Sequence, residues 1–356
     1  MDEEPDAEAI AERVLAAALG MMDVLSIHLG DRLGWYRSLA AEGPATPSEL
    51  AARTGTSERY AREWLHQQAT TGLVAADDDG EAPRFRLPPA AAEVLTNANS
   101  LNYLAPLARM LAGAAVQLPG LQDAYRAGAG VSWEDFGDEV RESQADMNRP
   151  WFEQELGTAL NQVPELVARL QEPGVEIADI GSGGGWSTIA LAEVFPSARV
   201  TGFDIDAASV DLARTNAADA GSAVEFHHLD ASGLPADQFD AVFAFECLHD
   251  MPYPQDVLSG VRRSLKQGGT AVVVDEAVAE IFNPPGTEVE RLMYGFSLLI
   301  CLPDGMSHPN SAGTGTVMRP ETLRRYASAA GFDEFKILPI QDFGFFRFYE
   351  LANSTR

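Results

Sequence analysis

Residues 176–188 read Glu-Ile-Ala-Asp-Ile-Gly-Ser-Gly-Gly-Gly-Trp-Ser-Thr, and this stretch decides the fold. A short, mostly apolar run ends in a cluster of glycines, and helix-forming residues follow from about Trp186. Glycine is required where a backbone turns tightly and approaches a ligand without a Cβ in the way. The stretch therefore predicts a buried strand, a ligand-binding loop and the first turn of a helix.

The spacing of the glycines separates the known kinds of nucleotide-binding loop. The dinucleotide pattern G-x-G-x-x-G/A fails from either starting glycine, because its third glycine position falls on Trp186 or Thr188. A Walker loop fails because no Gly-Lys-Ser/Thr follows. Asp179, two residues before Gly181, suits a ligand with an ammonium or sulfonium group better than a pyrophosphate.

Asp179, Gly181, Gly183 and Gly185 form the pattern D-x-G-x-G-x-G, which resembles the first motif of the class I S-adenosylmethionine-dependent methyltransferases. The resemblance covers residues 170–356, with four motifs in order. It implies an α/β, Rossmann-like domain of seven strands in the order 3-2-1-4-5-7-6, with strand 7 antiparallel, preceded by an α-rich winged-helix domain. It also implies S-adenosyl-L-methionine as the cofactor and S-adenosyl-L-homocysteine as the product. A generic α/β nucleotide fold is the competing interpretation.

The same resemblance assigns cofactor contacts to residues at the ends of successive strands. Asp204 would accept hydrogen bonds from both ribose hydroxyls, and Ile205 would pack on the adenine ring. Asp230 would accept a hydrogen bond from the adenine amino group, and the backbone carbonyl of Phe245 would face the methionyl ammonium. The expected cofactor-binding residues are Asp179, Gly181, Ser182, Gly183, Gly185, Asp204, Ile205, Asp230, Ala231 and Phe245.

His249 and Asp250 follow the fourth expected strand, and loops at the carboxyl ends of parallel strands form ligand sites. An imidazole, with an ordinary pKa of about 6.5, suits a base that works near neutral pH. The His-Asp pair and the winged helix together resemble the plant-type small-molecule O-methyltransferases and a prokaryotic winged-helix methyltransferase family. The resemblance implies that His249 is the catalytic base and that Glu276 orients it, with Asp275 as the competing candidate. A role for His249 as a structural anchor of the loop is the alternative.

Residues 46–87 run helix, turn, helix and two short extended segments, which predicts a winged helix. This fold often binds DNA, so a cofactor-binding transcriptional regulator is the alternative function. DNA binding requires cations beside phosphates, and the charges disfavour it. Acidic and basic residues cancel over residues 48–71, and the wing has a net charge of −2, from Asp77, Asp78, Asp79 and Glu81 against Arg84 and Arg86.

The change from helix-rich segments to short β-branched runs separated by helices predicts that the chain has three parts. They are a winged-helix and dimerisation domain over residues 1–98, a helical connector and active-site cover over residues 99–170, and the methyltransferase domain over residues 171–356. The first helix, within residues 7–20, carries Ile10, Val14, Leu15 and Leu19 on one side. We expect a homodimer that acts on a small-molecule acceptor.

The composition adds constraints on the environment. The 25 basic and 53 acidic residues give a net charge of −28. Such a surface repels nucleic acid and is typical of proteins kept soluble in concentrated salt; a high-GC genome alone would explain the scarcity of lysine but not the charge. Two cysteines make no disulfide framework, and no apolar run approaches the roughly 18 residues that a membrane span needs. We expect a cytoplasmic protein, and because no metal-ligand spacing is present, no metal.

Overall fold

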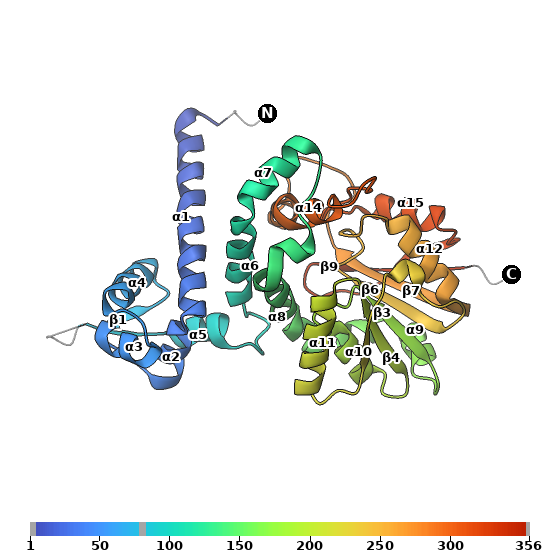
Figure 1. The fold of residues 1–356 in the computed structure, drawn as a ribbon, viewed down its shortest axis with the longest axis horizontal. Coiled ribbons are helices and arrows are strands. Elements are labelled where there is room, and N and C mark those ends of the chain that lie inside the picture. Colours follow the sequence, from blue (N-terminus) through green and yellow to red (C-terminus); the bar gives the residue numbers. More distant parts are fainter. Residues whose placement is uncertain (1–4, 78–82, 354–356) are drawn as a thin grey trace. The chain divides into compact units, whose positions relative to one another are not determined.

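The computed structural model describes residues 5–77 and 83–353, so the wing residues Asp78, Asp79 and Glu81 lie outside the described part. The chain forms two compact units, residues 1–112 and 113–356 (Figure 1). Helix α6 (Ala105–Val116) runs across the boundary between them. The division into three parts stays a prediction.

The first unit contains the expected winged helix. Helix α3 begins with a capping box, in which the Thr46 hydroxyl accepts from the Glu49 N–H and the Glu49 carboxylate accepts from the Thr46 N–H. It ends at Gly55, whose left-handed backbone (φ 67°) closes the helix. A core around Trp35, Tyr36 and Trp64 holds the unit together. Its elements are α1 (Ala7–Arg32), α2 (Trp35–Glu42), α3 (Pro47–Thr54), α4 (Glu58–Thr71), β1 (Ala75–Asp77), β2 (Arg84–Arg86) and α5 (Pro89–Thr96).

Helix α1 is longer than residues 7–20 and leaves its apolar side chains in solvent. Val14, Leu15 and Leu19 are 64%, 62% and 55% exposed, and Met22 is 62% exposed. An exposed apolar stripe of this length on a soluble domain marks an interaction surface.

The second unit is built on a seven-stranded sheet in the order β5-β4-β3-β6-β7-β9-β8. Numbered within the domain this order is 3-2-1-4-5-7-6, and the last chain segment, β9, runs antiparallel to β7. The predicted sheet topology is confirmed. The strands are β3 (Glu176–Ile180), β4 (Arg199–Asp204), β5 (Glu225–His228), β6 (Phe239–Phe245), β7 (Leu265–Glu276), β8 (Glu334–Ile337) and β9 (Phe346–Ala352).

Helices cover both faces of this sheet, and each face has its own core (Figure 1). The four helices α8 to α11 pack on one face through residues such as Leu156 and Ile189. Helices α12 and α15 pack on the other through Val257 and Leu323. The helices are α7 (Leu118–Ala127), α8 (Trp133–Leu160), α9 (Pro164–Leu170), α10 (Trp186–Val194), α11 (Ala207–Asp219), α12 (Pro254–Ser264), α13 (Glu288–Phe296), α14 (Leu302–Gly305) and α15 (Pro320–Ala329), with a 3-10 turn η1 (Ala231–Gly233) and a π-helical turn η2 (Ser297–Cys301).

Among the described residues, no helix combines the length and the apolar character that crossing a bilayer requires.

Candidate active site

The glycine loop between β3 and α10 has the backbone that its sequence predicts. Gly181, Gly183 and Gly185 all have positive φ angles, of 61°, 51° and 83°. A Cβ on Gly181 would lie 2.6 Å from the Cβ of Cys247, and one on Gly185 would lie 2.7 Å from the Phe226 ring. Any side chain at these two positions would therefore displace the loop.

Asp204, at the end of β4, is directed at this loop. Its Oδ2 accepts from the Gly183 N–H at 2.8 Å, and its Oδ1 accepts from the Asp206 N–H at 2.8 Å. Burial raises the pKa of the carboxyl, although the two backbone hydrogen bonds oppose the shift. The carboxylate thus lies where β3 and β4 end side by side.

Asp179 lies beneath the loop rather than on its surface. The side chain is fully buried, and its Oδ2 accepts from the hydroxyls of Ser187 and Thr188, each at 2.6 Å. Both hydroxyls belong to the first turn of α10, so Asp179 ties the strand to the helix. Oδ1 has no hydrogen-bond partner among the described residues, and burial raises the pKa of Asp179 to about 7.

The remaining expected cofactor residues lie along the same edge of the sheet. Ile205, just after β4, is 64% exposed, as an adenine-stacking residue must be before a ligand arrives. Asp230 follows β5 and accepts from the Ser232 N–H at 2.8 Å. Phe245, the last residue of β6, is buried, and so is Ala231. The fold therefore brings the ends of β3, β4, β5 and β6 together as the sequence predicts.

His249, four residues beyond β6, lies among carboxylates. The ring is 2% exposed. Its Nδ1 lies 3.1 Å from each oxygen of Asp275, and its Nε2 lies 3.2 Å from Oδ1 of Asp250. Glu276 Oε2 is 3.4 Å from Nδ1 and has no hydrogen-bond partner among the described residues. The hydrogen-bond geometry favours the competing candidate, Asp275, as the residue that holds the ring, and the orienting role of Glu276 stays a prediction.

Burial and the closeness of several carboxyl groups determine the pKa values around His249. Burial lowers the pKa of His249, but the carboxylates of Asp250, Asp275 and Glu276 outweigh it and raise that pKa well above its ordinary value. Burial also raises the pKa of Glu246 to about 8 and that of Glu276 well above its usual range. The His249 imidazole thus lies in a buried cluster of acidic side chains, in which burial favours the neutral forms of Glu246 and Glu276.

Two residues near His249 had no signal in the sequence. Cys301 ends the π-helical turn η2, and its thiol is in hydrogen-bonding reach of the His249 ring. Asp304 in α14 accepts from the Trp133 N–H at 2.8 Å, and burial raises its pKa to about 7. Both come from a segment some fifty residues further along the chain, and no local pattern in that segment marks them.

The long helix α8 contributes from the other side. Its Gln144 amide lies 3.5 Å from Oε2 of Glu246, and Asn148 hydrogen-bonds the same carboxylate. Arg141, 5% exposed, pairs with Asp206 at 2.8 Å. The second half of the predicted connector therefore forms part of the site.

Comparisons with known proteins agree with this geometry. Residues 177–269 match the family model described as a methyltransferase domain, and residues 17–97 match a winged HTH domain described as Rv2258c-like. The ubiquinone biosynthesis O-methyltransferase of Pseudomonas aeruginosa strain UCBPP-PA14 is 27% identical over 185 residues, which are 51% of this chain and 75% of that enzyme.

Two solved structures share the whole fold. Human N-acetylserotonin methyltransferase, solved in complex with SAM, superposes with a TM-score of 0.73 at 20% identity and full coverage of both chains. The mitomycin 7-O-methyltransferase MmcR superposes with a TM-score of 0.70 at 22% identity, over 98% of this chain and 99% of its own. The matched domains, the confirmed strand order and the glycine loop agree. The chain carries a methyltransferase domain of the S-adenosylmethionine-dependent kind, with a winged helix ahead of it.

Proposed function

We propose that the chain methylates a small-molecule acceptor on oxygen, with His249 as the general base. The observation that carries the proposal is the contact of His249 Nδ1 with both oxygens of Asp275. A carboxylate can only accept, so Nδ1 carries a hydrogen, and when the ring is neutral its lone pair is on Nε2. The O-methyltransferases of ubiquinone biosynthesis and of mitomycin support oxygen as the acceptor atom.

Bound S-adenosylmethionine would supply an electrophilic methyl group on a sulfonium. The acceptor hydroxyl would give its proton to His249 Nε2 while its oxygen forms the new bond to carbon, and the homocysteine thioether would leave. Asp250, 3.2 Å from Nε2, would stabilise the imidazolium that results. A positioned base of this kind contributes roughly 10²–10⁴-fold to the rate.

Burial opposes the protonated form of His249, but the surrounding carboxylates outweigh it and raise the pKa of the ring. A neighbouring sulfonium would lower that pKa again, because like charges disfavour the protonated ring. The base would therefore be prepared when S-adenosylmethionine is present and lost when the neutral thioether product remains.

The residues that would hold the cofactor are those at the ends of β3 to β6, from the glycine loop to Asp204, Asp230 and Phe245. The Asp204 carboxylate already holds the Gly183 N–H and so fixes the loop before a ligand binds. Ile205 offers an exposed apolar surface for the adenine.

His249→Ala tests the base role. Methyl transfer from radiolabelled S-adenosylmethionine is measured with a panel of phenols and hydroxylated aromatic compounds, and binding of S-adenosylhomocysteine is measured by calorimetry. We expect turnover to fall roughly 10²–10⁴-fold while product affinity is kept. His227→Ala, on β5, is the matched control. Unchanged turnover in His249→Ala would rule out the base and leave the anchor role.

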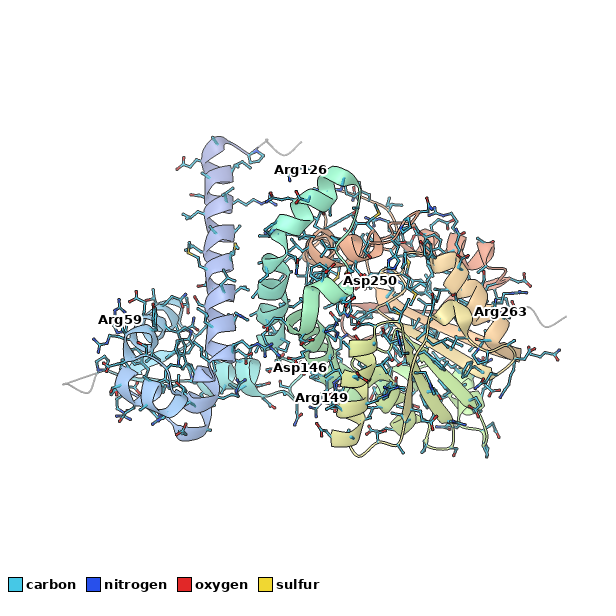
Figure 2. All side chains as sticks on the ribbon, viewed as in Figure 1. Arg59, Arg126, Asp146, Arg149, Asp250 and Arg263 are labelled. Atoms are coloured by element: carbon cyan, nitrogen blue, oxygen red, sulfur yellow. The ribbon has the colours of Figure 1, made fainter. Side chains whose placement is uncertain are left out.

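A transcriptional regulator is the second function considered, and the charges of the winged helix argue against it. Its arginines are neutralised by acids of the same unit: Arg59, labelled in Figure 2, pairs with Glu63 on α4, and Arg62 pairs with Glu58. Arg84 pairs with Glu49 at 2.9 Å. A mobility-shift assay on genomic fragments at working salt tests this alternative, which a specific shift would revive.

The exposed stripe on α1 supports a homodimer that pairs through this helix. The net charge of −28 supports adaptation to concentrated salt. Both cysteines, Cys247 and Cys301, are free, which fits a reducing compartment such as the cytoplasm.

A further inference from the structure

Glu246 holds a backbone conformation that its side chain does not favour. It follows the last residue of β6 and has a φ of 49°. Among the described residues, the other non-glycine positions with positive φ are Asp237, Asn310 and Asp342. Aspartate and asparagine adopt the left-handed region more readily than glutamate does, because their short side chains can hydrogen-bond locally. Strained residues of this kind collect at functional sites, so Glu246 marks a place to search for function.

The turn at Glu246 places its carboxyl group beside the proposed reaction centre. The Glu246 N–H donates to the Val274 carbonyl at 2.8 Å. The next residue of β7 is Asp275, which holds the His249 ring. The charge of His249 acts on the Glu246 carboxyl, and so does the charge of Asp275. Because Glu246 is half-buried while His249 is buried, part of Glu246 stays accessible next to the base.

One face of helix α8 approaches this carboxyl group. Gln144 and Asn148 are one helical turn apart and share that face. The Gln144 Nε2 lies 3.5 Å from Oε2 of Glu246, and Asn148 hydrogen-bonds the same carboxyl group. Ala145 packs against the glycine loop, since a Cβ on Gly184 would lie 2.5 Å from its Cβ. The carboxyl is therefore held by a helix that also packs on the expected cofactor loop.

The two amides of α8 decide what this carboxyl group can offer to a ligand. Amide N–H groups donate, so they occupy oxygen lone pairs of Glu246 and make no use of its hydrogen. Burial raises the pKa of Glu246 to about 8, so the group keeps its hydrogen at neutral pH. The His249 ring opposes this shift only while it is protonated. The matching ligand group is an oxygen without a hydrogen of its own, and a carbonyl oxygen accepts more strongly than an aryl ether does.

We propose that Glu246 determines acceptor specificity by donating a hydrogen bond to a carbonyl oxygen next to the hydroxyl that is methylated. The inference rests on the proposed function, because it takes His249 as the base for that hydroxyl. Glu246 and His249 both neighbour Asp275, so the two oxygens that they contact occupy neighbouring positions of one molecule. The acceptor class is thereby narrowed from phenols in general to ortho-hydroxy aryl ketones, esters and hydroxyquinones.

Such a hydrogen bond would assist the reaction as well as binding. In a free ortho-hydroxy carbonyl compound the hydroxyl hydrogen bonds the neighbouring carbonyl oxygen of the same molecule. Donation from Glu246 to that oxygen would replace the internal bond and leave the hydroxyl hydrogen for His249 Nε2. It would also draw electron density through the ring and lower the pKa of the hydroxyl, which favours transfer of its proton to the base.

Three phenols of similar size test the proposal. The ketone ortho-hydroxyacetophenone carries the carbonyl, ortho-hydroxybenzyl alcohol carries a second hydroxyl in its place, and ortho-ethylphenol carries no second oxygen. Calorimetry measures their affinities for the full chain saturated with S-adenosylhomocysteine, near neutral pH. We expect the ketone to bind roughly 10-fold more tightly than ortho-ethylphenol, which is the effect of one neutral hydrogen bond. Glu246→Gln keeps a donor and should retain this preference, and Glu225→Gln, an exposed acid on β5, is the matched control.

Glu246→Gly separates recognition from folding, because glycine suits the left-handed backbone and removes the carboxyl group. We expect this variant to melt at or above the parental temperature and to bind the ketone and ortho-ethylphenol equally. A residue that only anchored the loop would lower the melting temperature when it is removed.

The pH dependence of the preference gives a second measurement. As the pH rises through about 8, Glu246 loses its hydrogen and the parental chain should lose its preference for the ketone. Glu246→Gln does not titrate and should keep it. His249, Asp250, Asp275 and Glu276 face the same carboxyl group, but they are present in both proteins, so the difference between the two profiles belongs to Glu246.

A parental chain that binds the three phenols equally, or binds none of them, overturns the proposal. A preference for the ketone that survives in Glu246→Gly also overturns it, and so does a preference for ortho-hydroxybenzyl alcohol that Glu246→Gln abolishes, since the carboxyl would then accept. Transfer of radiolabelled methyl groups to the same phenols is measured separately. Equal transfer to all three keeps the proposed function and removes the role of Glu246, whereas a binding preference without any transfer supports that role and removes the proposed function.

Discussion

Asp275 contacts Nδ1 of His249 with both carboxylate oxygens, at 3.1 Å each, in a place from which water is excluded. Asp275 belongs to β7, and His249 lies four residues beyond the adjacent parallel strand β6. The carboxyl ends of these two strands meet at one edge of the sheet. The contact therefore follows from strand pairing, and it sets the direction of the imidazole lone pair.

Asp275→Asn should lower turnover while leaving cofactor affinity intact. The amide keeps the shape of the carboxylate but no longer selects the tautomer with hydrogen on Nδ1. The same exchange beside a catalytic histidine can lower kcat by about 10⁴-fold. Steady-state kinetics with S-adenosylhomocysteine calorimetry measures both quantities. Glu276→Gln is the matched variant, and a larger loss there than in Asp275→Asn would restore Glu276 as the orienting residue.

Asp204→Ala should abolish tight binding of S-adenosylmethionine. Hydrogen bonds to a charged group contribute about 1.5–3 kcal/mol each, so losing two of them weakens binding by about 100-fold or more. Calorimetry in high and low potassium chloride gives the affinity. Glu225→Ala, an exposed acid on the neighbouring strand β5, should change little. An Asp204→Ala chain that still binds with the parental affinity would show that the carboxylate has no part in the site.

Asp179→Asn should flatten the dependence of stability on pH. Burial raises the pKa of Asp179 from 3.8 to about 7, so the folded chain binds its proton more tightly than the unfolded chain. The stability this provides is complete below the ordinary pKa and is lost as the pH rises through about 7, amounting to a few kcal/mol at about 1.4 kcal/mol per pKa unit. Urea unfolding at acid and mildly alkaline pH measures the difference. Exposed Asp211→Asn should retain the parental slope.

Replacing Leu15 and Leu19 by glutamate should give a monomer. Both side chains lie in the exposed stripe of α1, where a charge in a helix–helix contact would be desolvated without a partner. Size-exclusion chromatography with light scattering gives the mass. Arg13→Gln, on the same helix, should leave the assembly unchanged. A parental chain that is already monomeric would refute pairing through α1.

The melting temperature should rise with potassium chloride. Salt screens the mutual repulsion of the 28 excess negative charges, and that repulsion acts more strongly on the compact state. Calorimetric scans from low to molar salt provide the measurement. A melting temperature that is already at its full value in low salt would rule out adaptation to concentrated salt.

The parts of the molecule that depend on local pattern could be predicted from the sequence. The glycine loop and the strand before it follow from a short run of residues that specifies its own backbone. The strand order came from the family resemblance that the D-x-G-x-G-x-G pattern carries. The winged helix could also be predicted from local pattern, because the capping box at Thr46 begins α3 and Gly55 ends it. Helix α1 is an exception, because the sequence predicts a helix only within residues 7–20 and the helix continues through Gly30. Gly30 lies against the Trp64 and Tyr36 rings, where a Cβ would not fit.

Contacts made by the fold could not be predicted in this way. Asp275 and Glu276 are neighbours in sequence, and only the strand geometry brings one of them onto the His249 ring with both oxygens. Cys301 and Asp304 approach His249 from a segment some fifty residues further along the chain, in which no local pattern marks them. The hydrogen bonds of Asp179 to two hydroxyls of α10 were not predicted either, and its contact with the cofactor stays a prediction.

The direction of the Cys301 side chain depends on the number of residues in the π-helical turn Ser297–Cys301. Such a turn holds one residue more than an α-helical turn, and each residue of an α-helix rotates the next side chain by about 100°. A related protein with one residue fewer between Glu288 and Cys301 could have the same residue types around His249. The sulfur of its cysteine would nevertheless point in another direction. The contact between that sulfur and the His249 ring therefore depends on the length of this segment as well as on its residue types.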